Sequence, residues 1–390
     1  MNAPLSPELQ LVAACCRPGA ERAVDDAVVR LAAHPGLDGK ALLATVARHR
    51  VAPQVLAALQ KSGVELDSVT GAGLRDIASR AAMRSLLLAG ESVALQTAFD
   101  QAGLHAIFLK GTALACLVHD DIGLKDSWDI DLLVPPAQVD PAITLLAGRG
   151  YVLHRPEGLS PEAFARFQTV SKECVLVHPV RKIFVELHWK LVDNPHELAG
   201  LSLSRTRHVS VASGQLRTLA DVELFAYLTV HGTRHSWSRL KWIADVAAFL
   251  RQKSEAEVRS LRDEAVAMGG GRGPDVALHL CSTLFGMPIP RLSLDLAGRY
   301  LVQGALLNLA WGEGRTEVSA HSRPWWMNRI GRHFTGGSRQ AFLSELARNG
   351  RGDHDQVELD LPRGLTPLYY LLRLPRWLWR RVAPAGRRAS

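Results

Sequence analysis

Cysteine, aromatic residues and long apolar runs are all scarce in this chain of 390 residues. The five cysteines, Cys15, Cys16, Cys116, Cys174 and Cys281, are odd in number and form no Cys-x-x-Cys pair. We therefore expect buried thiols in a reducing cytoplasm, and neither a disulfide framework nor a zinc site built on cysteine.

Two further absences concern membranes. No uncharged apolar run reaches the roughly 18 residues that a membrane-spanning helix needs. The N-terminus lacks the basic and apolar stretches of a secretory signal peptide, so we expect a cytoplasmic protein. With 47% hydrophobic residues the chain can bury two or three globular units. The net charge of +8 favours an acidic ligand such as a nucleotide, nucleic acid or an anionic membrane surface.

One segment of the chain has the pattern of a phosphate-binding loop. The apolar residues 107–109 predict a buried strand, and Lys110, Gly111 and Thr112 follow it at the start of an apolar helix. Glycine lets a backbone approach a ligand closely, and the free N–H groups of a helix start attract anions. We expect these residues to cradle phosphate, although a strand followed by Lys-Gly-Thr is also ordinary turn chemistry.

Carboxylates follow on two later strands. Asp129 and Asp131 are two residues apart on a predicted strand and therefore share a face. Glu186 interrupts the otherwise apolar strand 182–189, where an unpaired acid is costly to bury. Carboxylate oxygens suit Mg²⁺, and a phosphate cradle beside them suits phosphoryl or nucleotidyl transfer. The alternatives are a solvated face for the aspartates and an ion pair of Glu186 with the neighbouring residues 181–182.

In this order and spacing, Gly111-Thr112, Asp129-x-Asp131 and Glu186 resemble the nucleotidyltransferase superfamily with the DNA polymerase β-like palm. The resemblance implies that Asp129, Asp131 and Glu186 are catalytic metal ligands for Mg²⁺, with Mn²⁺ as an alternative. It also implies a nucleoside triphosphate such as ATP as the donor. Thr112 stands where that superfamily usually has Ser or Gly.

The predicted fold is α+β: a palm made of a small mixed sheet with helices, flanked by N- and C-terminal helical regions. We expect a helical scaffold in 1–100, the palm in 101–218, a helical domain in 219–350 and a basic aromatic tail in 351–390. The expected palm strands are 104–109, 129–134, 150–154, 173–178 and 182–189, with helices at 111–119 and 136–148. The expected caps are Asp38 and Ser68 as helix N-caps, Gly63 as a helix stop, and a capping box that starts near Thr218.

The segment 219–252 predicts a pair of helices that contribute to the site. His231 and His235 are four residues apart, and an amphipathic helix carrying Lys241 follows. With no third ligand nearby, zinc is disfavoured. We expect Lys241 or Arg239 on a phosphate and His231 near the nucleotide. The structural alternative is a salt bridge between Asp245 and Lys241.

Four short motifs in order are similar to the bacterial family of uncharacterised nucleotidyltransferases. They are the Leu-Lys-Gly of 109–111, the segment 123–134 with Lys125, the Glu-Leu-His-Trp of 186–189, and 231–245. That family often has Arg where Lys125 stands. A lysine keeps the positive charge but lacks the bidentate guanidinium fork. Lys125 remains a candidate for binding phosphate. The resemblance implies the palm fold and leaves the acceptor substrate unassigned.

Residues 363–390 carry seven arginines and no acid, interleaved with Tyr, Trp and Leu. Such a tail can lie on an anionic membrane or on nucleic acid, or pack as an ordinary helix. The leading hypothesis is nucleotidyl transfer to an unidentified small molecule, glycan, peptide or protein. The competing ones are a nucleotide-binding regulatory or antitoxin-like protein and a peripheral membrane protein of an envelope-glycan pathway. No pattern indicates a sequence-specific nucleic-acid reader.

Overall fold

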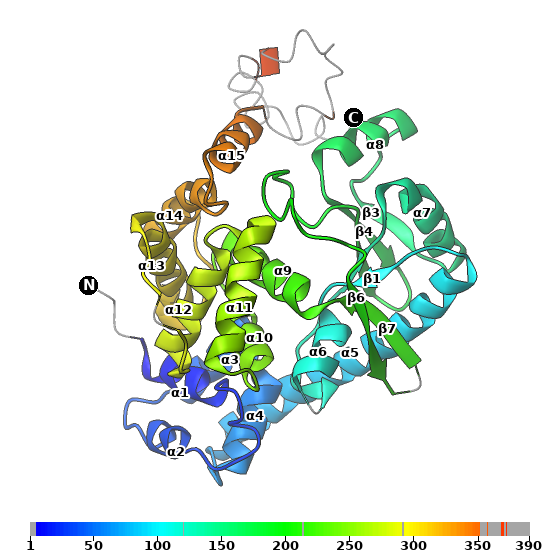
Figure 1. Cartoon of the computed structure of the whole chain (residues 1–390). Coiled ribbons are helices and arrows are strands. Elements are labelled where there is room, and N and C mark those ends of the chain that lie inside the picture. Colours follow the sequence, from blue (N-terminus) through cyan, green and yellow to red (C-terminus); the bar gives the residue numbers. More distant parts are fainter. Residues whose placement is uncertain are drawn as a thin grey trace.

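The computed structural model describes residues 5–351 except 120, 213 and 291, together with the isolated residues 357, 368, 369 and 372. It has the predicted α+β class, with a small mixed sheet between helical regions (Figure 1). The strands β1–β5 belong to the predicted palm. The basic tail 363–390 lies almost entirely outside the described residues, so its predicted membrane contact stays a prediction.

The N-terminal region folds into helices, as the apolar spacing predicts. Asp38 caps α3 as expected, and Gly63 follows the end of α4 with a positive φ. The predicted cap at Ser68 is wrong, because the side chain of Asp67 accepts from the N–H groups of Val69 and Thr70. The helices are α1 (Pro7–Cys15), α2 (Asp26–Ala32), α3 (Gly39–His49), α4 (Ala52–Lys61) and α5 (Ser68–Gln101).

The palm sheet has the strand order β1-β2-β5-β4-β3. Its central pair, β2 and β5, is parallel, and the other three pairs are antiparallel. Both central strands are rich in buried Ile, Leu and Val, which suits a sheet covered by helices. The strands are β1 (Ile107–Phe108), β2 (Ile130–Leu133), β3 (Val152–Arg155), β4 (Glu173–His178) and β5 (Ile183–His188), and the palm helices are α6 (Gly111–Val118), η1 (Ile122–Leu124), η2 (Pro136–Gln138), α7 (Val139–Gly148) and α8 (Pro161–Val170).

A hairpin that the sequence analysis did not anticipate completes the palm. Strands β6 (Thr206–Val211) and β7 (Gly214–Leu219) pair with each other as a separate two-stranded sheet. The predicted capping box near Thr218 does not form, because the Thr218 hydroxyl donates to the carbonyl of Phe108 on β1. The cap residue of α9 is Ala220, which has no side-chain oxygen. Thr218 therefore joins the hairpin to the strand that leads into the phosphate loop.

The C-terminal region is helical as predicted. Its first helix, α9, lies between the other helices of this region and the sheet (Figure 1). The glycine-rich segment 269–274 contains the end of the π-helical turn η3, a turn at 271–272 and the start of α12. No helix among the described residues is long and apolar enough to cross a membrane. The helices are α9 (Asp221–Arg234), α10 (Leu240–Leu250), α11 (Glu255–Ala265), η3 (Val266–Gly270), α12 (Gly273–Phe285), α13 (Leu296–Ala310), η4 (Trp311–Gly314), α14 (Arg323–Gly331), η5 (Arg332–Phe334) and α15 (Arg339–Arg351).

Candidate active site

Two of the predicted acids meet because β2 and β5 run parallel in the centre of the sheet. The register places Asp131 directly beside Glu186, and side chains at paired positions point to the same face. Asp131 is buried, whereas Glu186 is half-buried. The alternative ion pair between Glu186 and Arg181 does not form, because Arg181 pairs with Glu91.

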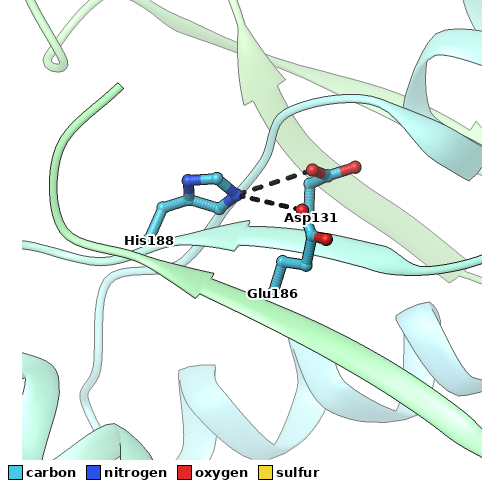
Figure 2. Close-up of side chains that lie close together, drawn as sticks. All are labelled: Asp131, Glu186 and His188. Carbon is cyan, nitrogen blue, oxygen red and sulfur yellow. Dashed lines mark ion pairs between the residues drawn. The ribbon is translucent and has the colours of Figure 1, made fainter. Parts of the chain in front are cut away.

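His188 lies two residues after Glu186 and faces both carboxylates (Figure 2). Its Nε2 atom is 3.5 Å from Asp131 Oδ1 and 3.8 Å from Glu186 Oε2, and its Nδ1 atom is 3.0 Å from Glu173 Oε2. Burial and the charge of Lys172 lower the pKa of the imidazole. The nearby carboxylates of Asp131, Glu186 and Glu173 outweigh both effects, so the pKa of His188 is raised above its ordinary value. The ring is thus oriented by acids on both nitrogens.

The loop after β1 lies against the strand that carries the aspartates. Gly111 has φ +56°, in the left-handed region that favours glycine, and a Cβ there would lie 3.5 Å from the backbone oxygen of Asp129. The first turn of α6 has no side-chain cap, so its N–H groups remain available, and Thr112 is buried in that turn. The predicted cradle is therefore next to the acids.

Lys110, which the sequence assigns to phosphate, instead contacts a carboxylate. Its Nζ is 2.9 Å from Asp131 Oδ1 and 3.5 Å from His231 Nε2. Although burial alone lowers the pKa of Lys110, the Asp131 charge raises it well above its ordinary value. Burial likewise opposes the Asp131 charge, but Lys110 and His188 hold the pKa of Asp131 below its usual range. The two side chains form a buried ion pair.

Asp129 has a different environment from Asp131. It is half-buried just before β2, and it has no ion pair among the contacts that the described residues make. Burial, followed by the charges of Asp131 and Glu186, raises its pKa to about 6, against the opposing effect of Lys110 and Lys241. Because neighbouring acids repel the charged form of Asp129, a bound cation would stabilise this carboxylate.

The two other predicted phosphate lysines have different surroundings. Both carboxylate oxygens of Asp245 lie 2.6 Å from Lys125 Nζ, and this pair is buried. The suggested pairing of Asp245 with Lys241 is therefore wrong. Lys241 is half-buried, and its Nζ lies 3.5 Å from the backbone oxygen of Asp126. The contact of Lys125 with a phosphate stays a prediction, and it would require a ligand that competes with Asp245.

His231 and His235 form a ring cluster with Trp242 beside Lys110. The two imidazole centroids are 4.5 Å apart, and each lies within 5.7 Å of the Trp242 ring. Burial is the main cause that lowers the pKa of His231 well below its ordinary value, so this ring is neutral at pH 7. His235 is exposed. An uncharged ring wall next to Lys110 is compatible with the predicted place of His231 near a nucleotide.

The sequence analysis did not assign several residues at this site. One of them is Glu173, which lies beside His188. It is the first residue of β4 and belongs to none of the sequence motifs. Arg50, Arg84 and Trp128 lie beside the acids, and the two arginines come from the region interpreted as a scaffold. Only their three-dimensional proximity identifies them, because positions 50 and 84 are far from 128 in the chain.

The donor set fits a divalent metal ion. Asp131, Glu186 and His188 each offer one ligand atom, and these three atoms lie within 4.8 Å of one another. The buried Asp131 Oδ1 is close to Lys110 but has no well-directed hydrogen bond, so part of its bonding capacity remains open. Carboxylates suit Mg²⁺ and Mn²⁺, while an imidazole adds affinity for later transition metals. His188 is a further ligand candidate, which in the sequence lies within the Glu-Leu-His-Trp motif of 186–189.

The comparisons with known proteins agree with this chemistry. The model of the family described as uncharacterised nucleotidyltransferase matches residues 35–286, which include both central strands, the phosphate loop and the α9–α10 pair. No curated protein and no solved structure matches the chain. The match covers more than half of the chain, and its range takes in Asp129, Asp131 and Glu186. The chain therefore belongs to the family of uncharacterised nucleotidyltransferases.

Proposed function

We propose that this protein is a metal-dependent enzyme that transfers a nucleoside monophosphate from a nucleoside triphosphate to an acceptor, with release of pyrophosphate. The observation that supports it best is the register of β2 and β5, which sets Asp131 beside Glu186. Asp129 adds a third carboxylate, whose pKa is raised by burial and then by the charges of the other two. Family membership supplies the general reaction class.

Asp129, Asp131 and Glu186 would hold the metal, with His188 as a further ligand or as a donor to the two carboxylates. A bound Mg²⁺ or Mn²⁺ would neutralise phosphate charge and align the donor for in-line displacement. Gly111 and Thr112 would place the start of α6 against the β- and γ-phosphates, where backbone N–H groups can donate.

Lys110 is close enough to Asp131 to share that carboxylate with the metal. A metal bound to Asp131 would share that carboxylate with the Lys110 ammonium, whose remaining N–H groups could donate to phosphate oxygens. The phosphate role that the sequence predicts for Lys110 is therefore compatible with its contact to Asp131.

The direct test is incubation with each labelled triphosphate and Mg²⁺ or Mn²⁺, with and without cell extract as the source of acceptor. We expect pyrophosphate release and a labelled product with at least one triphosphate, and neither with Asp131→Asn. Metal-dependent binding with no release under any of these conditions would instead favour the regulatory, non-catalytic protein. Failure of the wild type to bind any metal-triphosphate would overturn both.

A further inference from the structure

Trp128 immediately precedes Asp129 and exposes an indole that two arginines cover. The residue is 47% exposed, and the Arg50 and Arg84 guanidinium carbons lie 4.5 Å and 4.2 Å from the ring centroid. Arg84 comes from the middle of α5, and Arg50 from the α3–α4 corner. The helical region 1–100 therefore reaches the residue next to a predicted metal ligand.

The two guanidiniums differ in what else they contact. Arg84 pairs with the carboxylate of Asp126 and donates through Nε to the backbone oxygen of Ser127 at 2.9 Å. Arg50 is half-buried, and its guanidinium has no ion pair or side-chain hydrogen bond to any described residue. Arg84 therefore has a structural role in fixing the segment before β2. Arg50 has donors to spare.

The backbone of Arg50 is also unusual for its residue type. Its φ is +55°, in the left-handed region that residues with a Cβ rarely adopt, and it ends α3. Glycine or asparagine would be the ordinary choice at this helix end. An arginine here accepts a conformational cost, and the result is a guanidinium beside Trp128.

Lys241 on α10 is the second cation without a carboxylate partner. The acid one helical turn later, Asp245, pairs with Lys125. Among the described residues, the polar contact that Lys241 makes is the 3.5 Å approach of its Nζ to the Asp126 carbonyl. Burial and the nearby charges of Lys125 and Arg50 lower the pKa of Lys241 to about 7, and Asp129 opposes them. Two cations with spare donors therefore act electrostatically on Asp129.

We propose that Arg50, held over Trp128, and Lys241 form a phosphate-binding pair that holds the triphosphate of the donor nucleotide beside Asp129. The proposal rests on the proposed function and deepens it. A partly desolvated cation without a counter-ion is costly, and an anionic ligand removes that cost. The guanidinium fork matches two phosphate oxygens, and an ammonium serves a third as a point charge.

The test uses inorganic tripolyphosphate as the probe, without metal, so that it depends on neither a base nor an acceptor. Titration calorimetry compares the wild type with Arg50→Ala, Lys241→Ala and Arg50→Lys. The matched control is Arg80→Ala on α5, where the guanidinium pairs with Asp76 on the surface. Arg50→Ala keeps a Cβ and adds no backbone strain; melting curves check that each variant folds.

We expect both alanine variants to weaken tripolyphosphate binding at least tenfold, Arg50→Lys to weaken it less, and Arg80→Ala to leave it unchanged. Wild-type binding that neither alanine variant affects, or no binding by the wild type, would overturn the pair. The outcome is separable from the proposed function. Triphosphate turnover that survives both substitutions refutes the pair alone, whereas pair-dependent tripolyphosphate binding with no turnover of any nucleotide refutes only the transfer reaction.

Discussion

The acidic and basic sides of the candidate site are built in different ways. The acids lie on adjacent strands of one sheet, where the register of β2 and β5 sets Asp131 beside Glu186. The cations of the proposed phosphate pair come from a helix corner at Arg50 and from α10 at Lys241, 191 residues later by their numbering. Strand pairing fixes the acidic side locally, whereas the basic side exists only when two helical regions pack against the palm.

The difference has an electrostatic counterpart. The negative charge of Asp131 is balanced within the protein by Lys110 and His188. By contrast, Asp129, Arg50 and Lys241 form no ion pair with a described residue. The ion pair of Asp131 with Lys110 stabilises the fold itself. The uncompensated groups are those that gain from a metal-bound triphosphate, which carries both a cation and anions. Substitutions on the two sides should therefore separate stability from ligand binding.

The largest effect is expected for Asp131→Asn. It removes the central carboxylate and leaves the Lys110 ammonium without its partner. We expect turnover to fall by orders of magnitude and the free energy of unfolding to fall by about 3 kcal/mol, the scale for breaking a buried ion pair. Chemical denaturation and metal titration measure the two effects. The double variant with Lys110→Met should recover stability but not metal binding; wild-type metal affinity in Asp131→Asn contradicts the assignment.

Glu186→Gln tests the acidic side without breaking the Lys110–Asp131 pair. The charge of Glu186 contributes to the raised pKa of Asp129, so its removal relieves repulsion in the empty site. We expect the metal-free variant to melt at or above the wild-type temperature, to gain less from Mg²⁺ or Mn²⁺, and to lose turnover at least a hundredfold. A destabilised variant with a full metal-induced shift would indicate a structural ion pair instead.

Glu173→Gln changes how the imidazole is held and leaves the other acids intact. Because the Glu173 carboxylate lies 3.0 Å from His188 Nδ1, its charge supports the ring orientation and the basicity of the imidazole. We expect metal affinity to fall by about tenfold, the lower end of the range for an outer partner of a metal-binding histidine. The control is Glu162→Gln on the exposed start of α8. Unchanged affinity for Mn²⁺ would show that His188 is not a metal ligand.

The smallest effect is expected for Trp128→Ala on the basic side. Exposed cation–π contacts contribute about 0.5–1 kcal/mol each, so the loss of the indole should weaken tripolyphosphate binding by roughly two- to fivefold. The tripolyphosphate affinity of Trp128→Phe should lie between those of Trp128→Ala and the wild type. Calorimetry with Mn²⁺ alone should show no change. A loss of metal affinity as large as that of phosphate affinity would mean that Trp128 supports Asp129 rather than the arginines.

The acidic side was predictable because each clue is local. Asp129-x-Asp131 needs only the period of a strand, and Glu186 is conspicuous as an acid within apolar Val185 and Leu187. Their convergence also needed the superfamily resemblance, since no single strand reveals its neighbour in a sheet. The β6–β7 hairpin was missed because its strands mix exposed arginine, histidine and glutamine with few apolar residues.

The basic side could be predicted only in part. Lys241 is expected on a phosphate from its helix, whereas Arg50 could not be predicted, as the corner 48–50 shows. Its three consecutive basic residues have three different environments. Arg48 donates to the carbonyl of Asn308 at 2.7 Å, His49 accepts from the N–H of Leu240 at 3.1 Å, and Arg50 covers Trp128. The sequence shows a helix corner with positive charge. Which of the three side chains faces the site depends on the left-handed turn at Arg50 and on distant helices.

Helix α5 bears on whether this chain can be divided into modules. Its 34 residues make a rod of about 50 Å, which Figure 1 shows running from the N-terminal helices to the sheet. Near its midpoint, Arg84 and Ser85 bind the backbone of residues 125–127, directly before Asp129. A chain shortened to begin after Gln101 would keep every acid and every palm strand but lose the support that fixes their leading segment. Transplanting the site into another protein would therefore require the first hundred residues to travel with it.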